Sequence, residues 1–349
     1  MKEFLKKSKC LVRLYEAIMQ MIYKLKAILK RKYYLLNKKP KSVHYYGQKN
    51  KDRIFFVIPS DKNCGLYSNI LESIVCVEHA LKRGYIPVFD YKNNFAPMIQ
   101  DEDKRGLENA WEYYYEQPMK VSLEEVYQSK NVVFFNDEEF LMRRPDWREM
   151  FPASNRDLQK WHKVIVDNLR LQKPLKERVE REAARLFDGK REILGVGVRA
   201  GFRASHILKK ALIEGHPIIP TCEEMIQIVE KKMQEWNYEF LFLSCDDREY
   251  QQKFLKYFGD KCIVLERHLK HYFENDIPMC TEENLDWYLR EYQGISKREE
   301  VAEYLVEVYL LSKCDSLYSC IGGGAQFAYF LNGGKYKHLG VYNEGLIHL

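Results

Sequence analysis

The sequence predicts an α/β protein made of two domains that face a cleft, preceded by an amphipathic helix. Short apolar runs rich in β-branched residues alternate with longer segments of helical periodicity, which is typical of parallel sheets covered by helices. At 349 residues the chain is too long for one small core and suits two domains of ordinary size. Its 46% apolar and 30% charged residues are those of a soluble globular protein, so most of the chain should fold.

The first 41 residues hold the positive charge of the chain. Eleven lysines and two arginines against two glutamates give them a net charge of +11, so the other 308 residues carry −5 and the whole chain +6. Apolar residues recur there at helical spacing: Leu11, Leu14, Ile18, Ile22, Leu25 and Leu29. Without an apolar run of about 18 residues, neither a transmembrane helix nor a signal peptide is expected. We expect a basic amphipathic helix on an anionic membrane surface, the alternative being a helix packed on the body or in an oligomer.

Residues 1–50 are therefore assigned to this helix and a polar linker, and residues 51–188 to the first domain. Three strands are predicted in that domain, at 53–59, 86–89 and 131–135, with helical regions at 65–83 and 155–187, the second interrupted at Pro174. The turn Asn63-Cys64-Gly65 opens the first helix. Because it fits neither GxGxxG nor GxxxxGK[ST], it supports neither a dinucleotide fingerprint nor a P-loop.

Residues 189–349 are assigned to the second domain, in which strands and helices alternate again. Strands are predicted at 193–199, 239–244, 262–265 and 315–320, and helices at 222–236, 249–258 and 297–312, with a last helix from the glycine triplet through Phe330. Two Rossmann-like halves with a cleft between them are the simplest architecture for this order.

Arg199 closes the strand at 193–199, which reads ILGVGVR. Ligands of open α/β sheets bind at the carboxyl ends of the strands, so a guanidinium there can hold an anion. The alternative is a structural salt bridge. The triplet Gly322-Gly323-Gly324 lies between a strand and a helix, where glycine exposes amide donors at the positive end of the helix. This favours a phosphate-binding loop over a plain tight turn, and with Arg199 it could clamp a diphosphate.

Two carboxylates follow the strand at 239–244, in Cys245-Asp246-Asp247-Arg248. Aspartate at a helix start caps the free amides, and we expect Asp246 to be the cap and Asp247 the ligand candidate. No third carboxylate or histidine has the spacing of a metal site. The nine cysteines include no CxxC pair, so we expect free thiols in a reducing compartment, without zinc or disulfides.

The order of these motifs resembles the nucleotide-binding half of the fucosyltransferase superfamily that includes α1,6-, α1,2- and protein O-fucosyltransferases. The resemblance rests on a strand ending in VxVR, the later His216-Pro217, the strand ending LSCDD, the helix reading EVYLLSKCD and a small-residue loop. Upstream, residues 109–118 (NAWEYYYEQP) resemble the acceptor half of α1,6-like and bacterial members. With the turn at Asn63-Cys64-Gly65, residues 53–345 are covered.

The resemblance implies a GT-B-like fold and an enzyme that uses GDP-fucose without an essential metal or other cofactor. It assigns Arg199 to the β-phosphate, Gly322 to Gly324 to the phosphate loop, and Asp246 and Asp247 to the nucleoside. Glu307 matches an acidic residue that reads the guanine edge, although its position alone favours a solvated charge. Two departures stand out, because Gly197 replaces the usual histidine two residues before the arginine and the loop is all glycine instead of serine-rich.

These features predict an inverting glycosyltransferase that moves fucose to a hydroxyl of a cell-surface polysaccharide or lipid-linked oligosaccharide. Candidates for the base are His206, Glu214 and His216, and Glu214 is preferred because the family's proposed base is a glutamate shortly before the His-Pro. Asn63 and Gly65 are placed on the acceptor side or in a loop. The alternatives are a GT-B enzyme for another nucleotide sugar and a non-catalytic, membrane-associated sugar- or nucleotide-binding protein. We expect a cytoplasmic location on the inner face of the membrane and no nucleic-acid partner.

Overall fold

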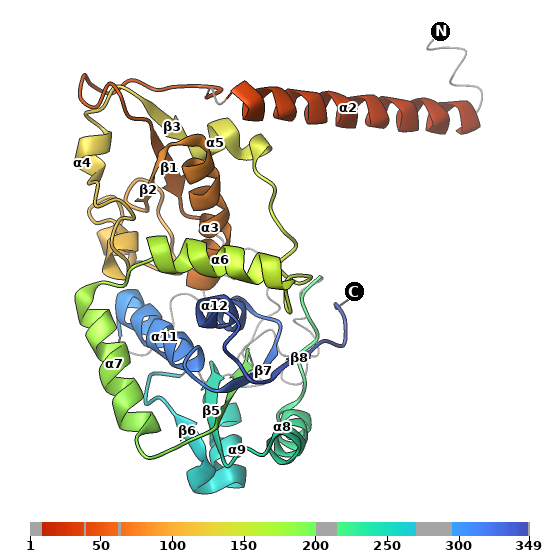
Figure 1. Ribbon diagram of the computed structural model, residues 1–349, viewed down its shortest axis with the longest axis vertical. Helices are drawn as coiled ribbons and strands as arrows, with labels where there is room; N and C mark the ends of the chain where they lie inside the picture. Colours follow the sequence, from red (N-terminus) through yellow and green to blue (C-terminus); the bar gives the residue numbers. More distant parts are fainter. Residues whose placement is uncertain (1–8, 38–39, 62–63, 200–214, 270–294, 348–349) are drawn as a thin grey trace.

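Two parallel sheets, each covered by helices, make up the protein (Figure 1). The computed structural model describes residues 9–37, 40–61, 64–199, 215–269 and 295–347. The first sheet has three strands in the order β2-β1-β3, and the second has five in the order β6-β5-β4-β7-β8. All their pairings are parallel, which confirms the predicted α/β class with two parallel-sheet halves.

The first sheet is built around β1. Its strands are β1 (Phe55–Pro59), β2 (Ile86–Asp90) and β3 (Val132–Phe134). Phe56 and Ile58 point into the core that contains α3 (Leu66–Arg83), whereas Val57 points to a small apolar cluster on the other face. The helix ends at Gly84, whose φ of 75° lies in the left-handed region that glycine adopts without strain. Two short helices, α4 (Leu123–Val126) and α5 (Phe135–Glu138), flank β3.

The second sheet is centred on β4. Its strands are β4 (Ile193–Val198), β5 (Phe240–Cys245), β6 (Cys262–Val264), β7 (Ser316–Cys320) and β8 (Leu339–Tyr342). Two glycines let neighbours approach β4 closely, because a Cβ on Gly195 would lie 2.8 Å from Leu311 Cδ1 and one on Gly197 would lie 2.8 Å from Ser319 Oγ. A histidine at position 197 would therefore collide with β7, which gives the departure at Gly197 a steric reason.

The longer helices fall where the sequence predicts them. They are α6 (Asn155–Asn168), α7 (Lys173–Phe187), α8 (Cys222–Trp236), α9 (Arg248–Phe258), α11 (Lys297–Leu311) and α12 (Gly323–Asn332). The interruption of the region 155–187 lies before Pro174, which occupies the first turn of α7, where its missing N–H costs no hydrogen bond. Helix α7 lies beside α11 of the second domain, and Arg178 Nη1 donates to Glu299 Oε1 at 2.7 Å.

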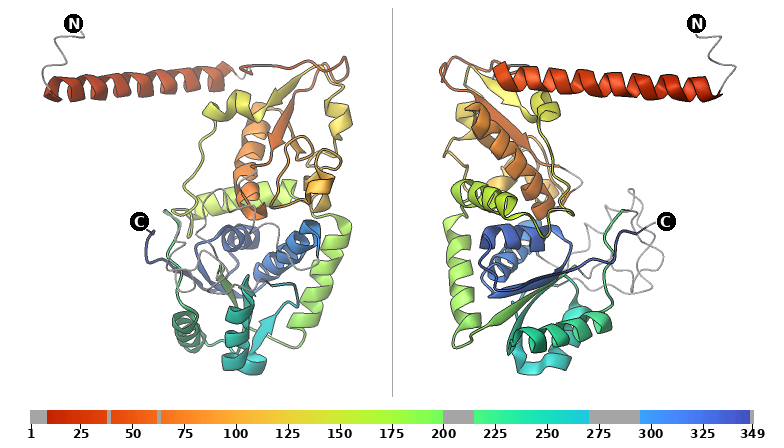
Figure 2. Two further views of the ribbon diagram at one scale, coloured as in Figure 1. Left: turned by 180° about the vertical axis from the view of Figure 1, so that it is seen from behind. Right: turned by 45° about the vertical axis from the view of Figure 1, so that its right-hand side comes forward.

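The two domains share one apolar core where α3 and α6 meet α12 (Figure 2). The ring centroids of Tyr67 on α3 and Phe327 on α12 lie 5.0 Å apart. The Tyr67 hydroxyl, on the first turn of α3, donates to the carbonyl of Leu305 at 3.3 Å. The start of α3 is thus held against the second domain.

Helix α2 (Lys9–Asn37) extends away from the first domain (Figures 1 and 2). Its last turns are tied to the body: Arg31 Nε donates to the Leu141 carbonyl at 3.0 Å, and Arg83 Nη1 donates to the Tyr34 carbonyl at 3.0 Å. No helix among the described residues is long and apolar enough to cross a membrane. The segment 40–52, expected as a linker, lies along the first sheet, where His44 pairs with Val132 as an antiparallel bridge.

Candidate nucleotide site

The predicted anion-binding residues converge at the carboxyl edge of the second sheet. From β4 the chain runs to β5 and β6 on one side, then crosses to β7 on the other side of β4. The β4/β7 pair is thus the topological switch point, where open α/β sheets bind ligands. A small crevice of about 30 Å³ lies there, and we call it the strand-end crevice. It is lined by Arg199 after β4, Asp246 after β5, and Gly322 and Gly324 after β7.

Arg199 and Asp246 face each other across this crevice. Arg199 Nε lies 3.5 Å from Asp246 Oδ2, and their side chains are 40% and 20% exposed. A partly exposed ion pair of this length contributes about 0–1 kcal/mol, so an anion can displace the carboxylate at little cost. Both readings of Arg199 from the sequence, salt bridge and anion ligand, are therefore compatible with this geometry.

The glycine triplet begins α12. Gly322 is the N-cap with extended backbone and, as a glycine, has no side chain with which to cap the helix; Gln326 N donates to the Gly322 carbonyl at 3.0 Å. The first amides of α12 carry the positive end of the helix dipole toward the crevice. Close packing explains two of the glycines: a Cβ on Gly324 would lie 2.3 Å from the Tyr304 hydroxyl, and one on Gly323 would lie 3.3 Å from the Cβ of Tyr67. Gly322 has open space where its Cβ would be.

The structure places the helix cap at Asp247, not at Asp246. Asp247 is the cap, because α9 begins at Arg248 and Asp247 Oδ1 accepts from Tyr250 N at 2.7 Å. Its side chain is buried, whereas Asp246 lines the crevice. The assignment of Asp246 as the cap was therefore wrong, because the N-cap is the residue directly before the first helical residue, Arg248. Asp247 as a ligand of the nucleotide stays a prediction.

Glu307 is fully buried on α11, so the reading of its position as a solvated charge was wrong. Its carboxylate accepts from Arg267 Nε at 2.9 Å, from Arg267 Nη2 at 3.0 Å and from Ser244 Oγ at 2.9 Å. Burial raises the pKa of Glu307 above its ordinary value, and the Arg267 guanidinium acts in the opposite direction. Arg267 also donates to the Cys245 carbonyl at 2.7 Å, so this bidentate pair braces the end of β5.

Tyr304, which lines the crevice, and Arg267, which pairs with Glu307, were not predicted from the sequence. The guanidinium of Arg267 lies 5.6 Å from the ring centroid of Tyr304, and this ring stands edge-on to Tyr67 at 5.2 Å. Tyr304 lines the strand-end crevice beside Gly324. Arg267 follows the end of β6, at the same sheet edge as Arg199 and Asp246, and that position was the available signal.

The other predicted site residues lie elsewhere or outside the described residues. His216 belongs to a segment that pairs with the end of the chain, where Ile347 N donates to its carbonyl at 2.8 Å, and it does not line the described crevice. Gly65 is the N-cap of α3, whose first turn touches Gly323. Asn63, His206 and Glu214 lie outside the described residues.

No protein-family model matches the sequence. A search of curated proteins finds no match either. Among solved structures, the chain is similar to the α1,6-fucosyltransferase NodZ, which has also been solved from Bradyrhizobium. In the form soaked with GDP-fucose, NodZ is 13% identical, and the match covers 80% of this chain and 93% of that one at a TM-score of 0.47.

The chain is similar in structure to fucosyltransferases. Arabidopsis thaliana FUT1, as a mutant in complex with GDP, is 12% identical, with 84% of this chain and 71% of that one covered and a TM-score of 0.43. POFUT1 in its apo form is 8% identical, with 84% and 99% covered and a TM-score of 0.45.

Proposed function

We propose that this protein is an inverting glycosyltransferase that moves fucose from GDP-fucose to a hydroxyl group of a glycan. The observation that carries the proposal is the meeting of Arg199 and the amino end of α12 in one crevice at the switch point of a parallel sheet. A guanidinium and the first amides of a helix are donors suited to a diphosphate. The choice of guanine as the base and of fucose as the sugar rests on the sequence resemblance.

The chemistry needs these donors most when the bond to the sugar breaks. GDP leaves from the anomeric carbon, and negative charge grows on its β-phosphate. Arg199 and the first amides of α12 would stabilise that charge, because they are positioned before the reaction begins. The bound diphosphate would displace the Asp246 carboxylate from the Arg199 guanidinium. Asp246 could then contact the nucleoside, which is the role that the resemblance implies for it.

The acceptor hydroxyl is a poor nucleophile and needs a base to take its proton as the new bond forms. We assign this role to Glu214, as the resemblance implies, with His216 as the other candidate. The proton passes from the acceptor oxygen to the base while the fucosyl carbon transfers to that oxygen, so configuration inverts in one displacement.

GDP should stabilise the protein in a thermal-shift screen against UDP, ADP and CMP. A dissociation constant one hundredfold below the ligand concentration would add about 2.7 kcal/mol of stability. We expect the shift, and GDP-fucose turnover, to persist in EDTA, since Arg199 and the helix amides supply the countercharge. Stabilisation by UDP alone would favour another nucleotide sugar, and no stabilisation by any nucleotide would favour the non-catalytic alternative.

We further propose that α2 attaches the protein to an anionic membrane surface. Its described apolar side chains form an exposed stripe that includes Met21, Leu25, Ile28 and Leu29, with Lys24 and Lys26 exposed close by. An apolar stripe flanked by lysines on a projecting helix suits the interface of anionic lipid and water. The glycan acceptor would then lie at that surface, and a cytoplasmic, inner-face location follows as part of the proposal.

Leu29→Glu should weaken binding to anionic vesicles by about tenfold or more, because burying a leucine side chain contributes roughly 1.5 to 3 kcal/mol. Leu107→Glu is the matched control, since Leu29 and Leu107 are 65% and 66% exposed. Vesicle co-sedimentation measures both, and added salt should weaken the wild-type protein's binding. Equal binding of the two variants would leave α2 as a packing or oligomerisation helix.

A further inference from the structure

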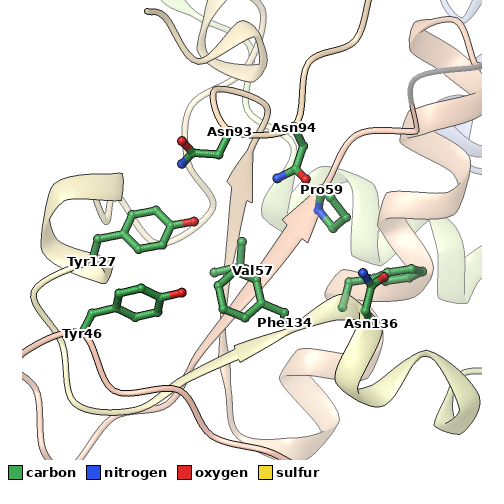
Figure 3. Close-up of a pocket in the computed structure, with 9 residues that line it drawn as sticks. Tyr46, Val57, Pro59, Asn93, Asn94, Tyr127, Phe134 and Asn136 are labelled. Atoms are coloured by element: carbon green, nitrogen blue, oxygen red, sulfur yellow. The ribbon is translucent and has the colours of Figure 1, made fainter. Parts of the chain in front are cut away.

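A second pocket, of about 500 Å³, opens at the carboxyl edge of the first sheet (Figure 3). Val57 lines it, while its neighbours Phe56 and Ile58 pack in the core that contains α3, so the pocket lies on the opposite face of the sheet. A pocket of this volume falls within the range of small-molecule sites. Neither the strand-end crevice nor its diphosphate chemistry accounts for it.

The chemistry of the lining indicates a neutral ligand rich in hydroxyl groups. The polar lining consists of three amides and two phenols: Asn93, Asn94, Asn136, Tyr46 and Tyr127. The apolar lining includes Val57 and Phe134. Figure 3 shows both phenol groups turned toward the space that Asn94 and Asn136 border. The described lining residues include no charged side chain. Amides both donate and accept hydrogen bonds, which matches hydroxyl groups, whereas an ionic ligand would find no counter-charge.

Asp90 holds three of these polar residues in place. Its buried Oδ2 accepts from the Tyr127 hydroxyl at 2.5 Å and from Asn93 Nδ2 at 2.8 Å, and its carbonyl accepts from Asn94 Nδ2 at 2.9 Å. These bonds use one N–H of each amide, and an amide also carries a second N–H and a carbonyl oxygen. The pocket is thus preorganised by a buried carboxylate that does not line it.

Tyr46 provides a half-exposed aromatic wall. Its ring stands edge-on to Tyr127 at 5.1 Å and to Phe134 at 6.3 Å, and the residue is 49% exposed. An aromatic side chain offers an apolar face and a polar tip, which suit the C–H face and the hydroxyl groups of a sugar ring.

We propose that this pocket binds a neutral sugar residue of the acceptor glycan, an inference that rests on the proposed function for its role in transfer. The pocket lies at the end of β1, since Pro59 lines it. The next helix along the chain, α3, packs its first turn against Gly323 of the glycine triplet in the second domain. An acceptor held here would lie on the first-domain side of the donor site. The sequence predicts that the first domain binds the acceptor, and the residues that line this pocket are our candidates for that role.

Saturation-transfer NMR on the full chain, with a panel of neutral and of uronic-acid oligosaccharides, tests the proposal. Neutral oligosaccharides should bind, and Asn136→Ala and Tyr46→Ala should each weaken that binding by about tenfold, the effect of losing one or two hydrogen bonds. Tyr45→Ala is the matched control, since Tyr45 is a 69% exposed neighbour that does not line the pocket. GDP affinity should be the same in all three variants.

Absence of binding by any neutral oligosaccharide, binding of only the anionic ones, or wild-type binding in both pocket variants would overturn the proposal. Because Tyr46 also packs against its neighbours, Asn136→Ala decides the case if Tyr46→Ala unfolds. Sugar binding that depends on the pocket without any GDP binding would support the pocket and contradict the glycosyltransferase. GDP binding without binding of neutral sugars would support the glycosyltransferase and contradict the sugar pocket.

Discussion

Arg199→Ala should weaken GDP binding by about ten- to hundredfold, since a hydrogen bond to a charged group contributes roughly 1.5 to 3 kcal/mol. Turnover should fall at least as far, because the charge on the leaving diphosphate grows in the transition state. The fold should persist, since the side chain is 40% exposed and its pair with Asp246 is weak. Isothermal titration calorimetry with GDP measures the first effect.

The matched control is Arg191→Ala. Arg191 is an exposed arginine just before β4, at the amino edge of the sheet, so its loss changes the net charge equally without touching the crevice. GDP affinity should not change in this variant. Equal loss of affinity in both variants would mean a general charge effect, and an unchanged Arg199→Ala variant would remove Arg199 from the site.

Arg267→Met should lower the free energy of unfolding by about 3 to 5 kcal/mol, because it leaves the Glu307 carboxylate buried without its cation. Adding Glu307→Gln should restore part of this loss, since the neutral amide needs no counter-charge. Urea unfolding measures both variants. Burial raises the pKa of Glu307, so uptake of a proton would limit the loss in the single variant.

Lys163→Met provides the comparison for this pair. Lys163 Nζ lies 2.7 Å from Asp167 Oδ2, but the two side chains are 78% and 51% exposed. An exposed pair of this kind contributes about 0.2 to 1 kcal/mol, so the variant should unfold close to the wild-type midpoint. A similarly small effect for Arg267→Met would show that the buried pair does not brace the site.

Strand and helix positions could be predicted because their local patterns are strong. The strands β1, β4 and β5 are largely apolar runs, as expected for buried parallel strands, and β7 is fully buried although two of its five residues are serines. The strand β8 was missed because it is short, half-exposed and interrupted by Gly340, so it lacks that pattern. Its pairing with β7, not its sequence, makes it a strand.

Only the site residues that directly follow a strand in the sequence could be predicted. Arg199, Asp246 and the glycine triplet each follow a recognisable strand, so a shared sheet edge could be inferred. The pair of Arg267 and Glu307 joins residues 40 positions apart and has no local signature. The pocket of the first sheet combines Tyr46, Asn94 and Asn136 from three separate segments, which only the fold brings together.

A crystal structure of the full chain with GDP would show most directly whether Arg199 and the start of α12 hold the diphosphate. We expect a β-phosphate within hydrogen-bond distance of the Arg199 guanidinium and of the first amides of α12, with Asp246 displaced from Arg199. GDP bound away from the β4/β7 switch point, or a diphosphate that contacts neither Arg199 nor the glycine triplet, would contradict this expectation.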